Sequence, residues 1–100
     1  MTIERLYALY GKLLTEKRGE LMEMFYELDL SLGEISSLTG LSRQAVSDAL
    51  QKSRRALAEY ENKLSLMDKF ARADKVIGEI AALGGEPARL AAQLKDILEE

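Results

Sequence analysis

The apolar positions of the first 30 residues recur at helical spacing and predict two short helices. A threonine precedes each apolar run, where N-cap residues stand: Thr2 for the first helix and Thr15 for the second. The apolar stripe of the first helix comprises Ile3, Leu6, Leu9, Tyr10, Leu13 and Leu14. That of the second comprises Leu21, Met22, Phe25, Tyr26 and Leu28. Because each stripe occupies one helix face, the two helices are expected to share a small core.

A third, shorter helix is predicted to start after Ser31. Ser31 followed three residues later by Glu34 is a capping box, in which each side chain accepts from a backbone N–H of the other residue. Ile35 and Leu38 are expected to form the apolar face of this helix. Gly40 stands just past its end, where the backbone turns left-handed and a residue without a β-carbon adopts that conformation easily. The helix is therefore expected to end in a tight turn.

A fourth helix follows the turn. Its expected N-cap is Ser42, and its buried stripe is predicted to comprise Ala45, Val46, Ala49 and Leu50. Two capped helices joined by a glycine-containing turn form a helix-turn-helix motif, here residues 31–55. In such a motif the second helix presents the outer face of its N-terminal end to a nucleic-acid groove.

The outward positions of the fourth helix are polar. They are Arg43, Gln44, Ser47, Asp48, Gln51 and Lys52. Such side chains can hydrogen-bond to phosphates and base edges. The predicted phosphate contacts are Arg43, Lys52 and Arg55, the predicted groove contacts are Gln44, Ser47 and Gln51, and Ser42 opens the site. The alternative is a face that is only solvated, or that pairs with acidic residues of a second copy.

The charge balance limits how tightly this face can bind. Fourteen basic and seventeen acidic residues give a net charge of −3, the wrong sign for phosphate attraction. Residues 42–60 nevertheless hold four basic against two acidic side chains, a local surplus of two. We therefore expect weak, salt-sensitive binding by a single chain, and tight binding only with a second copy or another protein partner.

No proline or glycine interrupts the helical pattern between Ser42 and Gly78, and the pattern continues to about Leu83. A continuous helix of about 42 residues would be about 63 Å long. An apolar seam with heptad-like spacing runs along it. Such a helix either folds back near residues 62–65 or packs against a second copy, and we favour a homodimer. The predicted dimer interface comprises Leu57, Tyr60, Leu64, Met67, Phe70 and Ile77.

The expected organisation is therefore an all-α protein in three parts. Residues 1–60 form the helix-turn-helix domain, 61–83 continue the long helix for dimerisation, and 84–100 form a C-terminal helix. Pro87 suits the first turn of that last helix. Its apolar edge comprises Leu90, Leu94, Ile97 and Leu98. This appendage either docks on the chain or awaits a partner.

Composition argues against several classes of protein. The chain has no cysteine and no histidine, so it lacks disulfides, thiolate metal ligands and the commonest general base. We expect no cofactor, no metal site and no enzymatic activity. No apolar run approaches the roughly 20 residues that span a bilayer, and the charged N-terminus is unlike a signal peptide. A soluble cytoplasmic protein is expected.

The run from about Ile3 to Phe70 resembles region four of bacterial sigma factors and, more closely, the small YlxM-like helix-turn-helix proteins. The segments that carry the resemblance are Leu14–Lys17, Phe25–Tyr26, Ser31–Ile35, Ser42–Val46 and Tyr60–Leu64. The resemblance implies a dimeric, all-helical accessory protein of the bacterial signal recognition particle pathway, with a regulatory role. Ser42, Arg43 and Gln44 match the start of the family's recognition helix. The segment beyond Gly84 is outside this resemblance.

Two functions remain open. One is an accessory regulator of the signal recognition particle that binds its RNA or the ribonucleoprotein. The other is a transcription regulator that places the same helix in the major groove of DNA. A-form RNA hides its major groove from side chains, so RNA binding would have to use shape, phosphates or an unpaired loop. The polar set suits DNA better, whereas the acidic total and the resemblance favour the first function.

Overall fold

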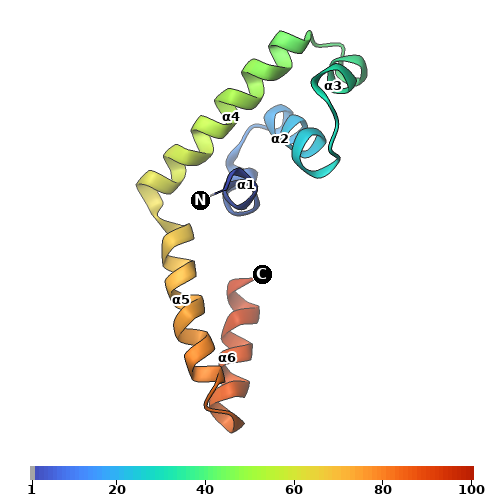
Figure 1. Ribbon diagram of the computed structural model, residues 1–100. Coiled ribbons are helices and arrows are strands. Elements are labelled where there is room, and N and C mark those ends of the chain that lie inside the picture. The colour runs from blue at the N-terminus through green and yellow to red at the C-terminus, as the bar shows by residue number, and fades with distance from the viewer. Residues whose placement is uncertain (1) are drawn as a thin grey trace. The chain divides into compact units, whose positions relative to one another are not determined.

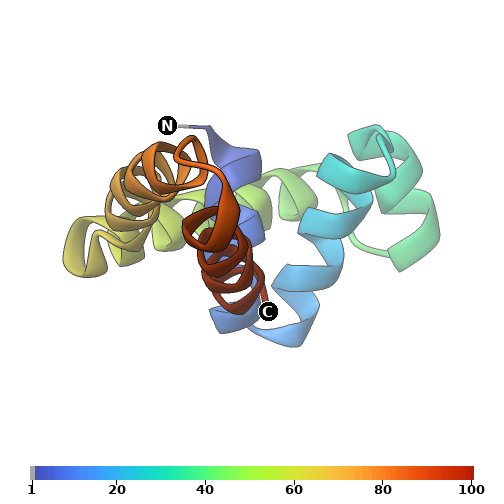
Figure 2. The same cartoon turned by 90° about the horizontal axis from the view of Figure 1, so that it is seen from below.

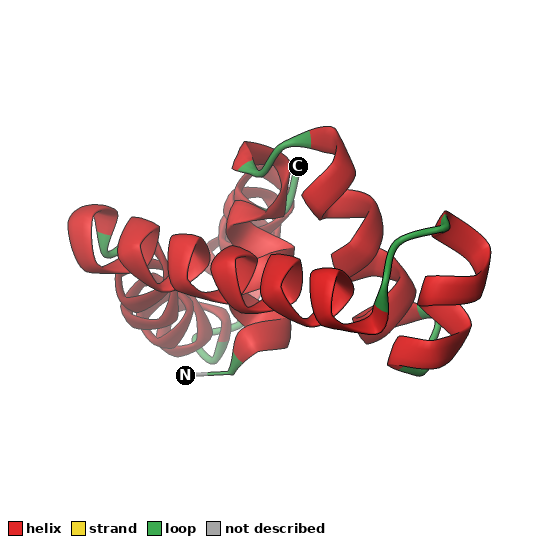
Figure 3. Cartoon of the chain, turned by 90° about the horizontal axis from the view of Figure 1, so that it is seen from above, coloured by secondary structure: helices red, strands yellow, loops and turns green. Residues whose placement is uncertain are grey.

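The computed structural model describes residues 2–100, which are helical apart from short caps and turns and contain no strand (Figure 3). The all-α prediction is confirmed. The chain divides into two compact units, one ending at Leu64 and the other spanning Ser65–Glu100. Within residues 2–100, no helix combines the length and the apolar character that crossing a membrane requires.

The first unit holds the helix-turn-helix motif. Its elements are α1 (Ile3–Tyr10), a 3-10 turn (Gly11–Leu13), α2 (Glu16–Met22), a π-helical turn (Glu23–Glu27), α3 (Leu32–Thr39) and α4 (Arg43–Leu64). Helices α1, α2 and α3 all pack against α4, the longest helix of the unit (Figure 1). The buried apolar side chains of this unit are Leu6, Tyr10, Leu21, Met22, Ile35, Val46, Leu50 and Leu57. These residues form the core that holds α3 and α4 in place.

The start of each of the first two helices is as predicted. The hydroxyl of Thr2 accepts from the backbone N–H of Arg5, and that of Thr15 accepts from the N–H of Arg18, both at 3.3 Å. The predicted apolar stripes are wrong at their ends, because Leu13 and Leu28 are exposed. Leu13 lies beyond α1 in the 3-10 turn, and Leu28 follows the π-helical turn. Both turns depart from 3.6 residues per turn, so the extrapolated stripe no longer points inward.

The second unit is a helical hairpin. Helix α5 (Leu66–Ala81) and helix α6 (Gly85–Leu98) lie side by side (Figures 1 and 2). Ile77 of α5 and Ala91 of α6 are its buried apolar residues. The C-terminal helix therefore docks on the chain's own α5. This helix begins at Gly85, two residues before the proline, and Pro87 lies in its first turn as expected.

Of the two possibilities for the long helix, the structure has the interruption near residues 62–65, and the continuous helix through residue 83 is wrong. Helix α4 ends at Leu64, Ser65 adopts a left-handed backbone with φ 55°, and α5 begins at Leu66. The backbone N–H of Lys69 then donates to the carbonyl of Ser65 at 3.0 Å, which opens a new ladder of hydrogen bonds. One left-handed residue is enough to interrupt the regular i to i−4 pattern. Residues 61–83 are thus not one continuation of α4.

The prediction of an uncovered dimer seam is wrong at Leu57 and Ile77. Leu57 is 0% exposed and Ile77 is 6% exposed within the chain itself. Spacing along one long helix predicts the seam, but it does not show that other helices of the same chain cover part of it. Among the other predicted interface residues, Tyr60, Met67 and Phe70 are partly exposed and Leu64 is 44% exposed.

Candidate nucleic-acid interface

The turn between α3 and α4 has the predicted backbone. Gly40 is left-handed, with φ 79°, and its N–H donates to the carbonyl of Ser36 at 2.9 Å. The hydroxyl of Ser36 donates to the carbonyl of Leu41 at 2.5 Å. The hydroxyl of Thr39 donates to the carbonyl of Ile35 at 2.8 Å and accepts from the N–H of Leu41 at 3.3 Å. Side-chain hydrogen bonds on both sides of the glycine therefore stabilise the turn. The residue pattern predicted the turn but not these hydrogen bonds.

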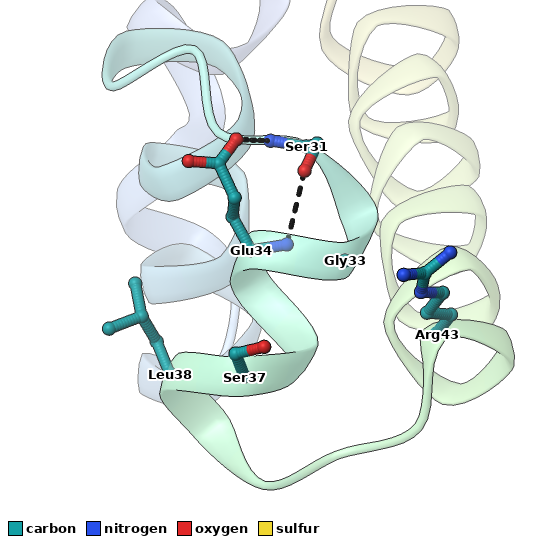
Figure 4. A pocket seen from close by; sticks show the side chains of 6 residues that line it. All are labelled: Ser31, Gly33, Glu34, Ser37, Leu38 and Arg43. Carbon is teal, nitrogen blue, oxygen red and sulfur yellow. Dashed lines mark hydrogen bonds between the residues drawn. The ribbon is translucent and has the colours of Figure 1, made fainter.

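The capping box at the start of α3 is confirmed (Figure 4). The Ser31 hydroxyl accepts from the N–H of Glu34, and the Glu34 carboxylate accepts from the N–H of Ser31, both at 3.1 Å. The hydrogen bond that the Ser31 N–H donates to the Glu34 carboxylate, and after it the Ser31 side chain, lower the pKa of this carboxyl below its ordinary value. Ile35 is buried as predicted. The inward orientation expected for Leu38 is wrong, because this side chain is 68% exposed and borders surface hollows.

Helix α4 begins as predicted at Ser42, whose hydroxyl accepts from the N–H of Ala45 at 3.0 Å. Val46 and Leu50 are buried. Ala45 was also predicted to be buried, but it is exposed. One residue corresponds to about 100° around a helix, so the position before Val46 points away from the core. The buried stripe continues instead through Ser53, whose hydroxyl donates to the carbonyl of Ala49 at 2.8 Å.

Most of the predicted contact residues share one face of α4. The exposed members of this face are Gln44, Gln51, Lys52 and Arg55. At about 100° per residue they lie opposite the buried stripe, with half-buried Ser47 at one edge. The Gln44 amide donates to the Asp48 carboxylate at 2.9 Å, so an acidic group also belongs to this surface. We call these six residues, with Asp48 included, the outer face of α4.

Arg43 is placed differently from the rest of the predicted set. Its guanidinium lies against the first turn of α3, so close that a β-carbon on Gly33 would be 2.9 Å from a guanidinium nitrogen. The side chain borders an open hollow of about 500 Å³ (Figure 4). The lining residues of this hollow are Ser31, Gly33, Glu34, Ser37, Leu38 and Arg43. Arg43 therefore extends the polar surface from α4 onto α3.

Arg54 is a basic residue of α4 that faces the protein. Its guanidinium donates to the hydroxyl of Tyr26 at 3.0 Å. This tie to the π-helical turn leaves Lys52 and Arg55 as the exposed cations in the middle of α4. The local charge surplus of the sequence is therefore smaller on the outer face than residue counts suggested.

Comparison with known proteins agrees with the helix-turn-helix motif seen in the structure. Residues 1–97 match the family described as "Putative helix-turn-helix protein, YlxM / p13 like". The chain belongs to this YlxM-like family. The resemblance is confirmed, and the match extends beyond Gly84 to residue 97, within α6, a segment that the resemblance in the sequence does not cover.

Relatives of similar length are found in bacteria. The chain is 36% identical over 94 residues to the UPF0122 protein of Bacillus thuringiensis, covering 94% of this chain and 86% of that protein. It is 43% identical over 74 residues to the UPF0122 protein of Desulforamulus reducens, covering 74% of this chain and 63% of that protein. The Bacillus alignment therefore spans both units of the structure.

Proposed function

We propose that this protein is an accessory regulator of the bacterial signal recognition particle pathway that acts in the cytoplasm and binds RNA or a ribonucleoprotein. The observation that carries the nucleic-acid part is the outer face of α4, where Gln44, Gln51, Lys52 and Arg55 are exposed together beside an ordered turn. Hydrogen-bonding and basic side chains on one helix face suit contacts with phosphates and base edges. The pathway comes from the family resemblance.

The charges of the outer face favour binding through a small number of phosphate contacts. Lys52 and Arg55 supply the phosphate contacts of the outer face, while Asp48 among them repels a second phosphate close by. The net charge of −3 does not favour long-range attraction of the whole chain to nucleic acid, so binding would depend on these local contacts. On RNA the helix would meet phosphates and unpaired bases, because the major groove of A-form RNA is too narrow for it.

The alternative function is a DNA-binding transcription regulator. One observation favours it: the exposed polar residues begin in the first turn of α4, and the N-terminal residues of a recognition helix contact base edges in the major groove of B-DNA. In that case Gln44 and Gln51 would hydrogen-bond to bases, and substituting Gln44 would alter the preference between sequences.

We further propose that the protein associates with a second copy through exposed apolar side chains. In the first unit Leu64 remains available for this contact. In the second unit a larger set is exposed: Val76, Leu83, Leu90, Leu94, Ile97 and Leu98. Isolated exposed apolar residues are common on monomers, but a group of this size in a two-helix unit indicates an interaction surface.

The nucleic-acid proposal is tested by electrophoretic mobility with the particle's RNA and with random duplex DNA at two salt concentrations. A triple variant, with Arg43, Lys52 and Arg55 replaced by alanine, should bind more weakly, and its salt slope should fall by about three units, one for each phosphate contact. The charge-matched control replaces Lys69, Lys75 and Lys95, which are exposed in the second unit.

The control variant should keep the wild-type slope if the contacts are local to the motif. Equal losses in both variants would show that binding follows net charge alone and would contradict the assigned face. If the folded triple variant binds RNA, DNA and the particle as the wild type does, the helix-turn-helix motif is only a scaffold.

A further inference from the structure

Gly33 is a helical glycine whose backbone does not require glycine. It lies in the first turn of α3 with a helical conformation and without a positive φ. Glycine inside a helix is less favourable than alanine by roughly 0.5–1 kcal/mol. What an alanine would meet is the Arg43 side chain: a β-carbon at residue 33 would be 2.9 Å from Nη2, 3.1 Å from Cζ and 3.3 Å from Nε. An alanine at residue 33 would therefore require the end of the Arg43 side chain to shift from its place.

Arg43 stands where a cation is electrostatically unfavourable. It is the first residue of α4, and the N-terminus of a helix carries partial positive charge. The ion pairs within 4 Å among residues 2–100 include Lys63–Glu59, Arg72–Asp68 and Arg89–Glu86, and none of these three involves Arg43. Glu34 lines the same hollow, but its carboxylate accepts from the Ser31 N–H, so Arg43 is placed to take an anion from outside.

The surroundings of the guanidinium fit one kind of anion. Ser37 and Arg43 flank the open hollow, and the Glu34 carboxylate is turned toward the backbone N–H of Ser31 (Figure 4). The planar fork of donors on a guanidinium matches two oxygens of a phosphate group. A nucleic-acid strand that runs past the start of α4 would bring its phosphates to this edge of the motif.

We propose that Gly33 is a positioning residue for Arg43. By leaving room on α3, it lets the guanidinium lie across that helix and contact a backbone phosphate of the bound nucleic acid, while Gln44 and Gln51 on the outer face remain available for bases. This inference rests on the proposed nucleic-acid binding. It adds α3 to the interface and separates the role of Arg43 from that of its neighbour Gln44.

The test compares two glycine-to-alanine substitutions. Gly33→Ala places a β-carbon against the guanidinium, whereas Gly19→Ala in α2 has nothing within 4 Å of the added atom. Both variants should be at least as stable as the wild type, since alanine favours helices. The probes are the particle's RNA and random duplex DNA, with affinity measured over a series of salt concentrations.

The Gly33→Ala variant should lose about one unit of salt slope and bind several-fold more weakly, while Gly19→Ala should match the wild type. Arg43→Ala should show the same loss, and the double variant Gly33→Ala, Arg43→Ala should lose no more than either single variant. Such non-additivity would show that the two residues act on one phosphate contact.

Three results would overturn the inference. If Gly33→Ala keeps the wild-type slope while Arg43→Ala loses one unit, Arg43 needs no room on α3. If neither changes the slope while replacing Lys52 and Arg55 does, the proposed function stands and Arg43 has no phosphate contact. If the wild type binds neither probe, the proposed function falls and this inference falls with it.

Discussion

Arg43 and Gln44 are neighbours in the chain, yet they serve different parts of the surface. The Arg43 guanidinium rests against Gly33 of α3, whereas the Gln44 amide lies on the outer face and donates to Asp48 at 2.9 Å. Consecutive residues on a helix point about 100° apart, so polar residues that read as one set along the sequence separate in space. The role of a polar residue on α4 therefore depends on which residues of other helices it contacts in the fold.

Ser42 sets the start of the helix that carries this surface. Its hydroxyl accepts from the N–H of Ala45, and Ser42→Ala should lower the free energy of unfolding by about 1 kcal/mol. Ser47→Ala is the matched control, since it removes a hydroxyl from the same helix without removing a cap. Urea denaturation followed by circular dichroism measures both. An unchanged midpoint for Ser42→Ala would mean that the cap does not stabilise α4.

At the scale of the helices, the caps could be predicted from nearby residues, whereas the exact position of the helix break could not. The caps at Thr2, Thr15, Ser31 and Ser42 follow from residues within one turn of each other, and all are present. The break at Ser65 falls within residues 62–65, where the sequence allows the helix to fold back, but serine is neither a glycine nor a proline and does not mark the position. A left-handed serine costs energy that the surrounding structure must offset.

That break can be tested directly with Ser65→Gly. Glycine adopts a left-handed backbone without the clash of a β-carbon, so this substitution should leave stability unchanged or raise it by up to about 1 kcal/mol. The control is Ser37→Gly in α3, where the backbone is helical and glycine should destabilise by a similar amount. Thermal unfolding of the two variants gives the comparison. A loss of stability in Ser65→Gly equal to that in Ser37→Gly would indicate a helical backbone at residue 65.

At the scale of the whole molecule, the apolar residues divide between the core and the surface. Leu57 is buried in the chain, and in the second unit Ile77 lies with the alanines of α6 at positions 88, 91 and 92. The larger side chains of α6, including Leu90 and Leu94, are left exposed. A face of small residues suits close packing of two helices, so the leucines remain for another surface.

Self-association is therefore expected to depend on Leu94. Replacing it with glutamate should give a monomer, because a charge in an apolar contact loses more than the roughly 1.5–3 kcal/mol that burying a leucine contributes. Gln93→Glu, on an exposed polar position of the same helix, is the control for the added charge. Light scattering at tens of micromolar measures the mass. A wild-type mass near 11.2 kDa, that of one chain, would contradict self-association.

The sequence by itself determined the starts of α1, α2, α3 and α4, the left-handed turn at Gly40 and the polar character of α4. Each of these depends on residues close together in the chain, whose hydrogen bonds and backbone preferences act locally. The buried positions Ile35, Val46 and Leu50 also followed from helical spacing, because a short helix packs through one continuous stripe.

Only the tertiary structure decided which apolar and basic residues reach the surface. The burial of Ile77, the exposure of Leu38 and the hydrogen bond from Arg54 to Tyr26 all depend on elements brought together from separate parts of the chain. Helical spacing gives the direction of a side chain on its own helix, but not what covers that direction. For the same reason the contact between Arg43 and Gly33 could not be predicted, since it requires α3 and α4 to be packed at the angle that the Gly40 turn and the shared core impose.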